Sequence, residues 1–361
     1  MSKQHELVQF SRGATSGGSK NLLMNGAQVI SQRGTAALTA SASSDTFITD
    51  RFRISNYSDA TFTGQQVVDA PTDFKYSCKV TTTGTDTSLA SGQYQRFITA
   101  IEGYNMNHLN YGSSNAKTCT LSFYVKSSLT GAFYVFGFNA AANRSIVVGY
   151  TIDAANTWEK KTLTIAGDTS GTWLTTNGAG MYFGWSIGSG TNFHTTTTDA
   201  FQAGFKMAKS DQVNVAGTSS ATWQITGCQL EVNDSSTDFD HEDYGTTLAK
   251  CQRYFYTLTG LPNGRHLGGV VMRNNQYFYG YPRSFPTPMR VAPTFTYNNI
   301  SLYVGDNTNG FNTMTLAAAE TDAFSFNGNA AGAVTAAETG HSGLLYIDTV
   351  SGRHVTFDAE L

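Results

Sequence analysis

The chain has 361 residues, which is enough for one large domain or two of medium size. Hydrophobic residues make up 40% of it and support a packed core, whereas charged residues make up only 14%, below the ~25% of a typical soluble domain. The formal net charge is −3 and no cluster of Lys and Arg stands out, so the sequence argues against a protein that binds nucleic-acid phosphates.

Residues 1–20 are polar and end in a Gly/Ser-rich stretch, which predicts an arm. We expect its apolar residues Leu7, Val8 and Phe10 to lie along the surface of a partner. The segment lacks the apolar region of a secretory signal, and no run approaches the ~20 apolar residues of a membrane span. We therefore expect a product that is made and soluble in a cytoplasm and is not inserted in a membrane.

Short runs of alternating apolar and polar residues follow the arm, separated by Gly, Asn, Ser and Asp. In the clearest run, four apolar residues share one face of a predicted strand: Cys119, Leu121, Phe123 and Val125. Residues 131–139 are aromatic on both faces, as expected in the middle of a sandwich. At Gly227 the apolar phase slips by one residue, which predicts a β-bulge. Together these runs predict an antiparallel β-sandwich, or jelly roll, over residues 21–240.

The one credible helix covers residues 246–256, where four residues fall on one face: Leu248, Cys251, Gln252 and Phe255. Five of the six prolines then lie between residues 261 and 293, and strand-like runs resume from residue 294 to the end. We therefore predict an all-β fold in which a short helix and a smaller β-domain, residues 241–361, follow the sandwich.

Two segments resemble catalytic or phosphate-binding motifs, but both lack the context that the chemistry needs. Residues 184–188 match G-x-S-x-G, yet strand alternation runs straight through Ser186 and no helix follows. Residues 13–20 approach a P-loop, but Ser19 occupies the position of the motif's lysine. The seven histidines are scattered. The sequence therefore predicts no enzyme and no cofactor.

The densest group of carboxylates lies before the predicted helix and consists of Glu231, Asp234, Asp238, Asp240, Glu242 and Asp243. Carboxylates are ligands that calcium prefers, but the spacing lacks the EF-hand pattern. A solvated turn is the favoured interpretation and no metal site is predicted, while calcium binding and a glycosidase-like pair of acids stay open.

The four cysteines show no zinc-binding spacing. Their apolar surroundings favour four buried thiols, although a bridge between Cys78 and Cys119 stays open.

The most aromatic run is 277–283, in which Tyr277, Tyr279 and Tyr281 alternate onto one face that Arg283 continues. Exposed, these residues form a platform that stacks on sugar rings and donates hydrogen bonds. Buried, they serve packing or a subunit interface. Because aromatic side chains usually pack, burial is the expectation, and ligand binding is the functional alternative.

Five short segments, in the same order, resemble segments of bacteriophage tail-fibre, adsorption and virion structural proteins. They are NLLMNG (21–26) with QRG (32–34); DRF (50–52); TWEK (157–160); QLE (229–231) with DF (238–239) and LAKCQRYF (248–255); and FDAEL (357–361).

The resemblance implies a jelly roll similar to a carbohydrate-binding module and a C-terminal β-domain, both mounted on a virion. It implies a homotrimer whose arm docks onto other virion proteins and whose β-domains project outward to contact host-surface glycans. A capsid decoration or head-fibre protein without a receptor role is the alternative, and a polysaccharide-cleaving tailspike enzyme is a further one. The resemblance leaves attachment to tail or head open.

Overall fold

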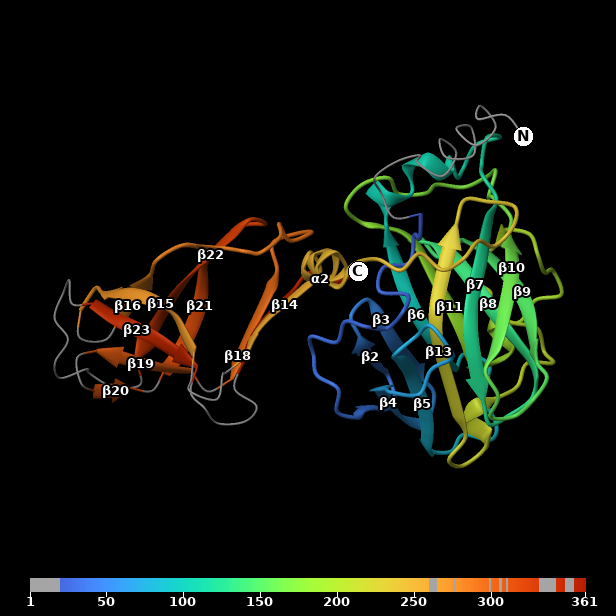
Figure 1. Cartoon of the computed structure of the whole chain (residues 1–361), viewed down its shortest axis with the longest axis horizontal. Coiled ribbons are helices and arrows are strands. Elements are labelled where there is room, and N and C mark those ends of the chain that lie inside the picture. Colours follow the sequence, from blue (N-terminus) through green and yellow to red (C-terminus); the bar gives the residue numbers. More distant parts are fainter. Residues whose placement is uncertain are drawn as a thin grey trace, which may run out of the picture.

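The computed structural model describes residues 20–259, 265–274, 277–298, 300–304, 307–309, 311–330, 342–347 and 354–361. The predicted arm residues Leu7, Val8 and Phe10 lie outside these ranges. Strands dominate, and they pair in antiparallel fashion throughout both sheets of the sandwich. The predicted all-β fold is thus confirmed. Figure 1 shows a large sandwich and a smaller group of strands on either side of helix α2, Tyr244–Gln252.

The first sheet of the sandwich has six strands among the described residues, in the order β1-β4-β5-β13-β7-β10. Their bounds are β1 Leu38–Ala40, β4 Thr61–Val67, β5 Ser77–Gly84, β13 Thr222–Glu231, β7 Cys119–Ser127 and β10 Glu159–Ile165.

The second sheet has seven described strands, in the order β12-β9-β8-β11-β6-β3-β2. Their bounds are β12 Gln202–Ala203, β9 Arg144–Ile152, β8 Gly131–Asn139, β11 Ala179–Ser189, β6 Tyr94–Glu102, β3 Phe52–Tyr57 and β2 Ser44–Thr49. In the part of the chain that the structure describes, four short 3-10 turns lie in the connections: η1 Gly103–Asn105, η2 Asn107–Leu109, η3 Thr191–Phe193 and η4 Val215–Gly217.

Large aromatic side chains from both sheets fill the space between them. Phe123 of the first sheet lies 5.6 Å, between ring centroids, from Trp185 of the second. Trp223 of the first sheet lies 5.6 Å from Phe97 of the second. All four are fully buried, and burying a Phe side chain contributes about 1.5–3 kcal/mol. This core fixes which residues of each strand must face outward.

Strand β8 is covered on both faces, as its sequence predicts. Phe133 and Val135 belong to the central core, whereas Phe136 and Phe138 belong to a second cluster on the outer side of the sheet. The segment that carries Phe205 packs over that outer cluster, with its ring 4.6 Å from that of Phe138.

The predicted bulge at Gly227 is confirmed. The register between β13 and β7 shifts between Thr226 and Gln229, and Gly227 has φ +62°. A side chain at that backbone angle is strained, so glycine fits the position.

Helix α2 covers Tyr244–Gln252, so the predicted bounds 246–256 are wrong at both ends. The helix starts early because the Asp243 carboxylate accepts hydrogen bonds from the backbone N–H groups of Gly245 and Thr246. It ends early because Phe255 begins strand β14 instead of a further helical turn. No described helix has the length and apolar character needed to cross a membrane.

The smaller group of strands contains a three-stranded sheet, in the order β14-β24-β18, and a larger sheet. The first has bounds β14 Phe255–Thr259, β24 His354–Asp358 and β18 Thr294–Asn298. The larger sheet contains β17 Arg283–Ser284, β22 Ala323–Ala330, β16 Tyr277–Gly280, β15 Arg265–Met272, β23 Ser342–Ile347, β19 Ile300–Val304, β20 Asn307–Asn309 and β21 Phe311–Ala319. A second aromatic core, separate from that of the sandwich, packs around Phe357, whose ring lies 4.5 Å from that of Phe324.

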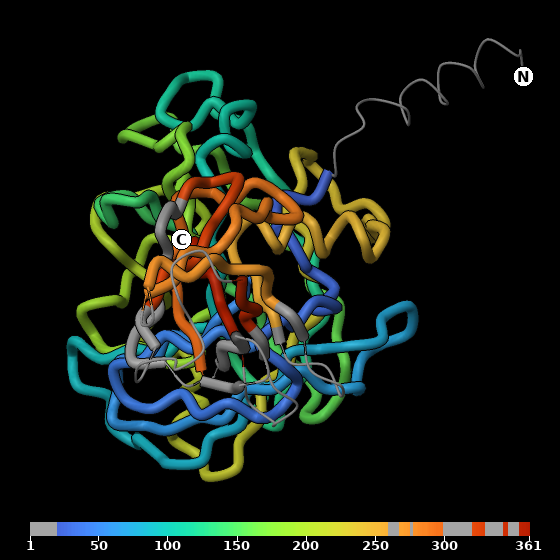
Figure 2. The backbone as a smooth tube through the Cα atoms, turned by 90° about the vertical axis from the view of Figure 1, so that its left-hand side faces the viewer, coloured from blue at the N-terminus to red at the C-terminus, as the bar shows by residue number. Residues whose placement is uncertain are grey.

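Figure 2 shows the chain from the side of the smaller group of strands, which lies in front of the sandwich. Ion pairs and stacked guanidinium groups join the two groups of strands. Arg51 of the sandwich forms a buried ion pair with Glu360, and its guanidinium lies 3.6 Å from the centroid of the Tyr254 ring. Arg33 stacks on Phe255 at the same distance and approaches Glu360 to 3.6 Å. The sandwich therefore holds both the residues after α2 and the end of the chain.

A second ion pair supports the same contact. Arg253 donates to both carboxylate oxygens of Glu102, at 2.6 and 3.0 Å, and Tyr254 donates a further hydrogen bond. Burial raises the pKa of Glu102, but the hydrogen bonds from Arg253 and Tyr254 outweigh it and lower the pKa. Glu102 therefore stays ionised where it meets α2.

The four cysteines are buried and unpaired, as favoured from the sequence, so the alternative bridge between Cys78 and Cys119 is not formed. Burial raises the pKa of Cys119 to about 11.

We predict that Glu102→Gln lowers the free energy of unfolding by about 3 kcal/mol, because it leaves the Arg253 charge without its partner. Chemical denaturation measures this loss. In the wild-type protein the ionised Glu102 contributes its full stabilisation above the ordinary carboxyl pKa of 4.5, and this stabilisation is lost as the pH falls through the lower pKa of the folded state. The variant has no carboxylate at this position, so it also lacks this part of the pH dependence of stability. Asp153→Asn, at an exposed pair with Lys161, is the control and should change stability by less than about 1 kcal/mol. An equal loss of stability in both variants would contradict the conclusion that the ion pair between Glu102 and Arg253 stabilises the contact.

Candidate functional site

A groove lies on the outer face of the first sheet, over strands β13, β7 and β10. Its volume is about 510 Å³. The residues that shape it include Phe74, Tyr124, Lys160, Gly227, Phe239 and His241. Strands supply Tyr124, Lys160 and Gly227, whereas the connections before β5 and after β13 supply the rest.

Four rings gather at one wall of this groove. The Phe74 ring lies 5.5 Å from that of Tyr124, 5.0 Å from that of Phe239 and 5.2 Å from that of His241, measured between centroids. Phe239 and His241 are 4.8 Å apart. We call Phe74, Tyr124, Phe239 and His241 the aromatic wall. Phe74, Tyr124 and Phe239 are half-buried and His241 is exposed, so the wall remains accessible.

The strand pleat and the bulge place the aromatic wall. Phe123 and Val125 point into the core, so Tyr124 between them must point outward. Gly227 lies beneath Phe74, where an added Cβ would come within 2.7 Å of the ring. Glycine at the bulge therefore adopts the required backbone angle without strain, and its lack of a side chain leaves room for the Phe74 ring.

A polar cluster continues the same face beyond Tyr124. Trp158 Nε1 donates to the Asp69 carboxylate at 3.3 Å, and Lys126 pairs with the other carboxylate oxygen. Lys126 Nζ lies 5.0 Å from the centroid of the Trp158 ring. Burial raises the pKa of Asp69, but the bonds from Lys126 and Trp158 outweigh it and lower the pKa. The indole of Trp158 thus lies next to fixed hydrogen-bonding groups.

This arrangement suits a sugar ligand. Aromatic faces stack on the apolar faces of sugar rings, and neighbouring donors and acceptors bind their hydroxyl groups. Two exposed carboxylates, Asp73 and Asp238, also line the groove.

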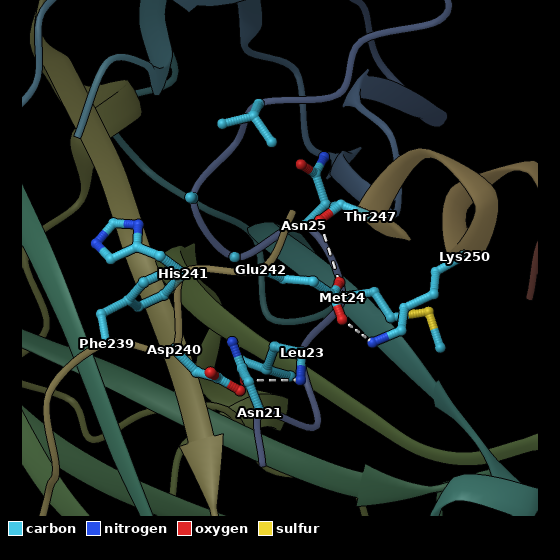
Figure 3. A pocket seen from close by; sticks show the side chains of 13 residues that line it. Asn21, Leu23, Met24, Asn25, Phe239, Asp240, His241, Glu242, Thr247 and Lys250 are labelled. Atoms are coloured by element: carbon cyan, nitrogen blue, oxygen red, sulfur yellow. Dashed lines mark hydrogen bonds and ion pairs between the residues drawn. The ribbon is translucent and has the colours of Figure 1, made fainter. Parts of the chain in front are cut away.

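The acidic stretch before α2 folds into caps and ion pairs around a smaller cavity of about 80 Å³. Figure 3 shows Glu242 directed at Lys250 of α2, with which it forms an ion pair, while Asp240 lies next to Asn21. Glu231 accepts hydrogen bonds from Thr237. Among the described residues no group of His, Cys, Asp or Glu is arranged to hold a metal ion. Asp234 to Asp243 form the connection before the helix, in agreement with the favoured interpretation as a turn. Glu231 instead belongs to strand β13 and is buried, so the prediction of a solvated turn is wrong for this residue.

The tyrosines of the predicted platform are exposed, so the expectation of burial is wrong for the single chain. Tyr277, Tyr279 and Tyr281 are 44%, 47% and 61% exposed, whereas Phe278 between them is buried. The predicted alternation is confirmed, and Phe278 is the residue that packs in the core. Arg283 is exposed too and donates to the carbonyl of Leu267.

Ser186 lies inside strand β11 and is fully buried. Its hydroxyl donates to the Gln212 side chain at 3.0 Å. The strand continues through this serine, in agreement with the interpretation that it is not at a nucleophile elbow.

The groove does not follow from the sequence alone. Tyr124 and Lys160 occupy outward positions of alternating strands, and this is the one signal that the sequence offers for it. Phe74, Phe239 and His241 come from connections without periodicity, so their meeting depends on the fold.

No family model matches the chain, and no curated protein matches it. Among solved structures, it is similar to one described as "CBM4 structure and function", with 13% identity, coverage of 51% of this chain and 88% of the other, and a TM-score of 0.29. A family 11 carbohydrate-binding module of a Clostridium thermocellum cellulase shows 9% identity, coverage of 58% and 99%, and a TM-score of 0.29. The enzymatically active domain of bacteriophage CBA120 tailspike protein 4 shows 13% identity, coverage of 60% and 22%, and a TM-score of 0.31. These scores are too low to support a conclusion about function.

We predict that Gly227→Ala destabilises the protein and displaces Phe74, because it adds both backbone strain and a clash with the ring. Strain at such an angle costs about 1–2 kcal/mol. The matched control is Gly204→Ala, at φ +83° with no atom within 4 Å of the added Cβ, which carries the strain alone. Chemical denaturation should therefore show the larger loss for Gly227→Ala. Equal losses would mean that Phe74 does not depend on the bulge.

Proposed function

We propose that this protein is a non-catalytic glycan-binding component of a bacteriophage virion, of the fibre or adsorption type. The observation that carries the glycan-binding part is the aromatic wall, which lies open in a groove beside the cluster of Asp69, Lys126 and Trp158. Apolar ring faces next to oriented polar groups are what a sugar needs for stacking and hydrogen bonding.

Binding at such a groove is weak for one copy and strong for several. A shallow site that stacks a few sugar rings gives a modest affinity, and copies joined in one particle raise the effective concentration of the next site. We therefore include a symmetric homo-oligomer, a homotrimer, in the proposal. The exposed strip of Tyr277, Tyr279, Tyr281 and Arg283 is proposed as a second ligand-binding surface.

The virion part of the proposal rests on the five segments that resemble phage fibre and adsorption proteins. In it, the N-terminal arm docks onto tail or capsid proteins through Leu7, Val8 and Phe10, and the strands project outward. The protein is made in the host cytoplasm and becomes part of the particle. Neither nucleic acid nor a membrane is a proposed partner.

The first test is binding of the full chain to host-surface polysaccharide. Tyr124→Ala should weaken binding at least tenfold, because it removes a stacking face from the wall. Tyr244→Ala removes a tyrosine that is 61% exposed and lies outside both proposed surfaces, so it should bind as the wild type does. If Tyr279→Ala loses binding and Tyr124→Ala does not, the glycan binds at the exposed strip of tyrosines and not in the groove. If the wild-type protein does not bind, the proposal is overturned.

The second test is competition. Purified protein added to host cells should reduce phage adsorption, and Tyr124→Ala should not. Unchanged adsorption would favour a decoration or head-fibre protein without a receptor role. Release of reducing ends from the polysaccharide, abolished by Asp73→Asn or Asp238→Asn, would instead show an enzyme and contradict the non-catalytic assignment.

A further inference from the structure

Two carboxylates lie in the groove next to rings of the aromatic wall. Asp73 lines the groove and directly precedes Phe74 in the chain. Asp238 lines it too and directly precedes Phe239. The rings of Phe74 and Phe239 are 5.0 Å apart, measured between centroids. The connections before β5 and after β13 therefore each bring a carboxylate to the same wall.

An ammonium group reaches the groove from the sheet. Lys160 of β10 lies opposite Tyr124 of β7, and its Nζ is 6.0 Å from the centroid of the Tyr124 ring. Asp73, Asp238 and Lys160 are all exposed, and within the described part of the chain none of their side chains forms a hydrogen bond or an ion pair. Charged groups of both signs are therefore available to a ligand that stacks on the wall.

A hydroxyl group matches all three of these charged groups. The ionised carboxylates of Asp73 and Asp238 only accept hydrogen bonds, whereas the ammonium group of Lys160 only donates them. A hydroxyl both donates and accepts, so the hydroxyls of a sugar can bind groups of either sign. A carboxylate on the ligand would instead repel Asp73 and Asp238, and an amine would repel Lys160.

We propose that the ligand of the groove is a neutral polysaccharide, and that Asp73, Asp238 and Lys160 determine this specificity. The inference rests on the proposed glycan-binding function and adds the charge of the ligand. A sugar ring stacks on the aromatic wall, while its hydroxyls donate to the two carboxylates and accept from the ammonium group. Because hydrogen bonds to ionised groups are stronger than those between neutral groups, these contacts favour a ring with free hydroxyls.

The test uses the full chain and a panel of neutral oligosaccharides. Each member is compared with a form in which one hydroxymethyl group is oxidised to a carboxylate, and with a form in which an amine replaces one hydroxyl. Isothermal titration calorimetry at low salt should show at least one neutral member binding about fivefold more tightly than both of its charged forms, which is the size of one exposed charge contact.

Two variants test whether the charged groups cause this preference. Asp73→Asn/Asp238→Asn keeps oxygen acceptors but removes the negative charge, so the carboxylate form should then bind as tightly as the neutral member. Asparagine suits position 73, where φ is +74°. Lys160→Gln should in turn remove the difference between the amine form and the neutral member. The control Asp199→Asn removes an exposed carboxylate next to β9 of the other sheet, so it should keep both differences.

The contrary outcomes separate the two proposals. If every oligosaccharide that binds does so at least as tightly in a charged form, or if both differences survive the variants, the neutral ligand is overturned and glycan binding stands. If no member binds in its neutral or its charged forms, the proposed function itself is overturned.

Discussion

The two-residue repeat of a β-strand couples the core of this sandwich to its outer face. In β7, burial of Phe123 and Val125 forces Tyr124 and Lys126 outward, and the neighbouring strands repeat this division. The candidate site is therefore specified by the same strands that build the core. A shift of one residue would reverse both faces, and between β13 and β7 the bulge at Gly227 absorbs such a shift.

Strands and bulge were predictable because their periodicity is local. The run around Phe123, the two-sided strand of residues 131–139 and the bulge at Gly227 all follow from spacing alone. Spacing does not tell which face of a strand another element covers. Alternation therefore predicts that Tyr277 and Tyr279 share a face, but not that this face is exposed. In the same way Phe255 fits a helical spacing, although it pairs with β24 in a sheet.

The aromatic wall and the contact between the two groups of strands could not be predicted, since both join distant parts of the chain. Arg51 and Glu360 are separated by 309 positions in the sequence. Several segments that carry the phage-protein resemblance meet at this contact, namely 32–34, 50–52, 248–255 and 357–361. In the fold these segments attach residues 357–361 to the sandwich through ion pairs. The groove lies elsewhere, on the outer face of the first sheet.

Hydrogen–deuterium exchange with and without a bound glycan tests the central claim most directly. A ligand in the groove would slow exchange in residues 72–76, 119–128, 158–162 and 226–241, and the rest of the sandwich would stay unchanged. Protection confined to residues 277–283, or to the outer side of the second sheet, would contradict the assignment of the groove as the binding site.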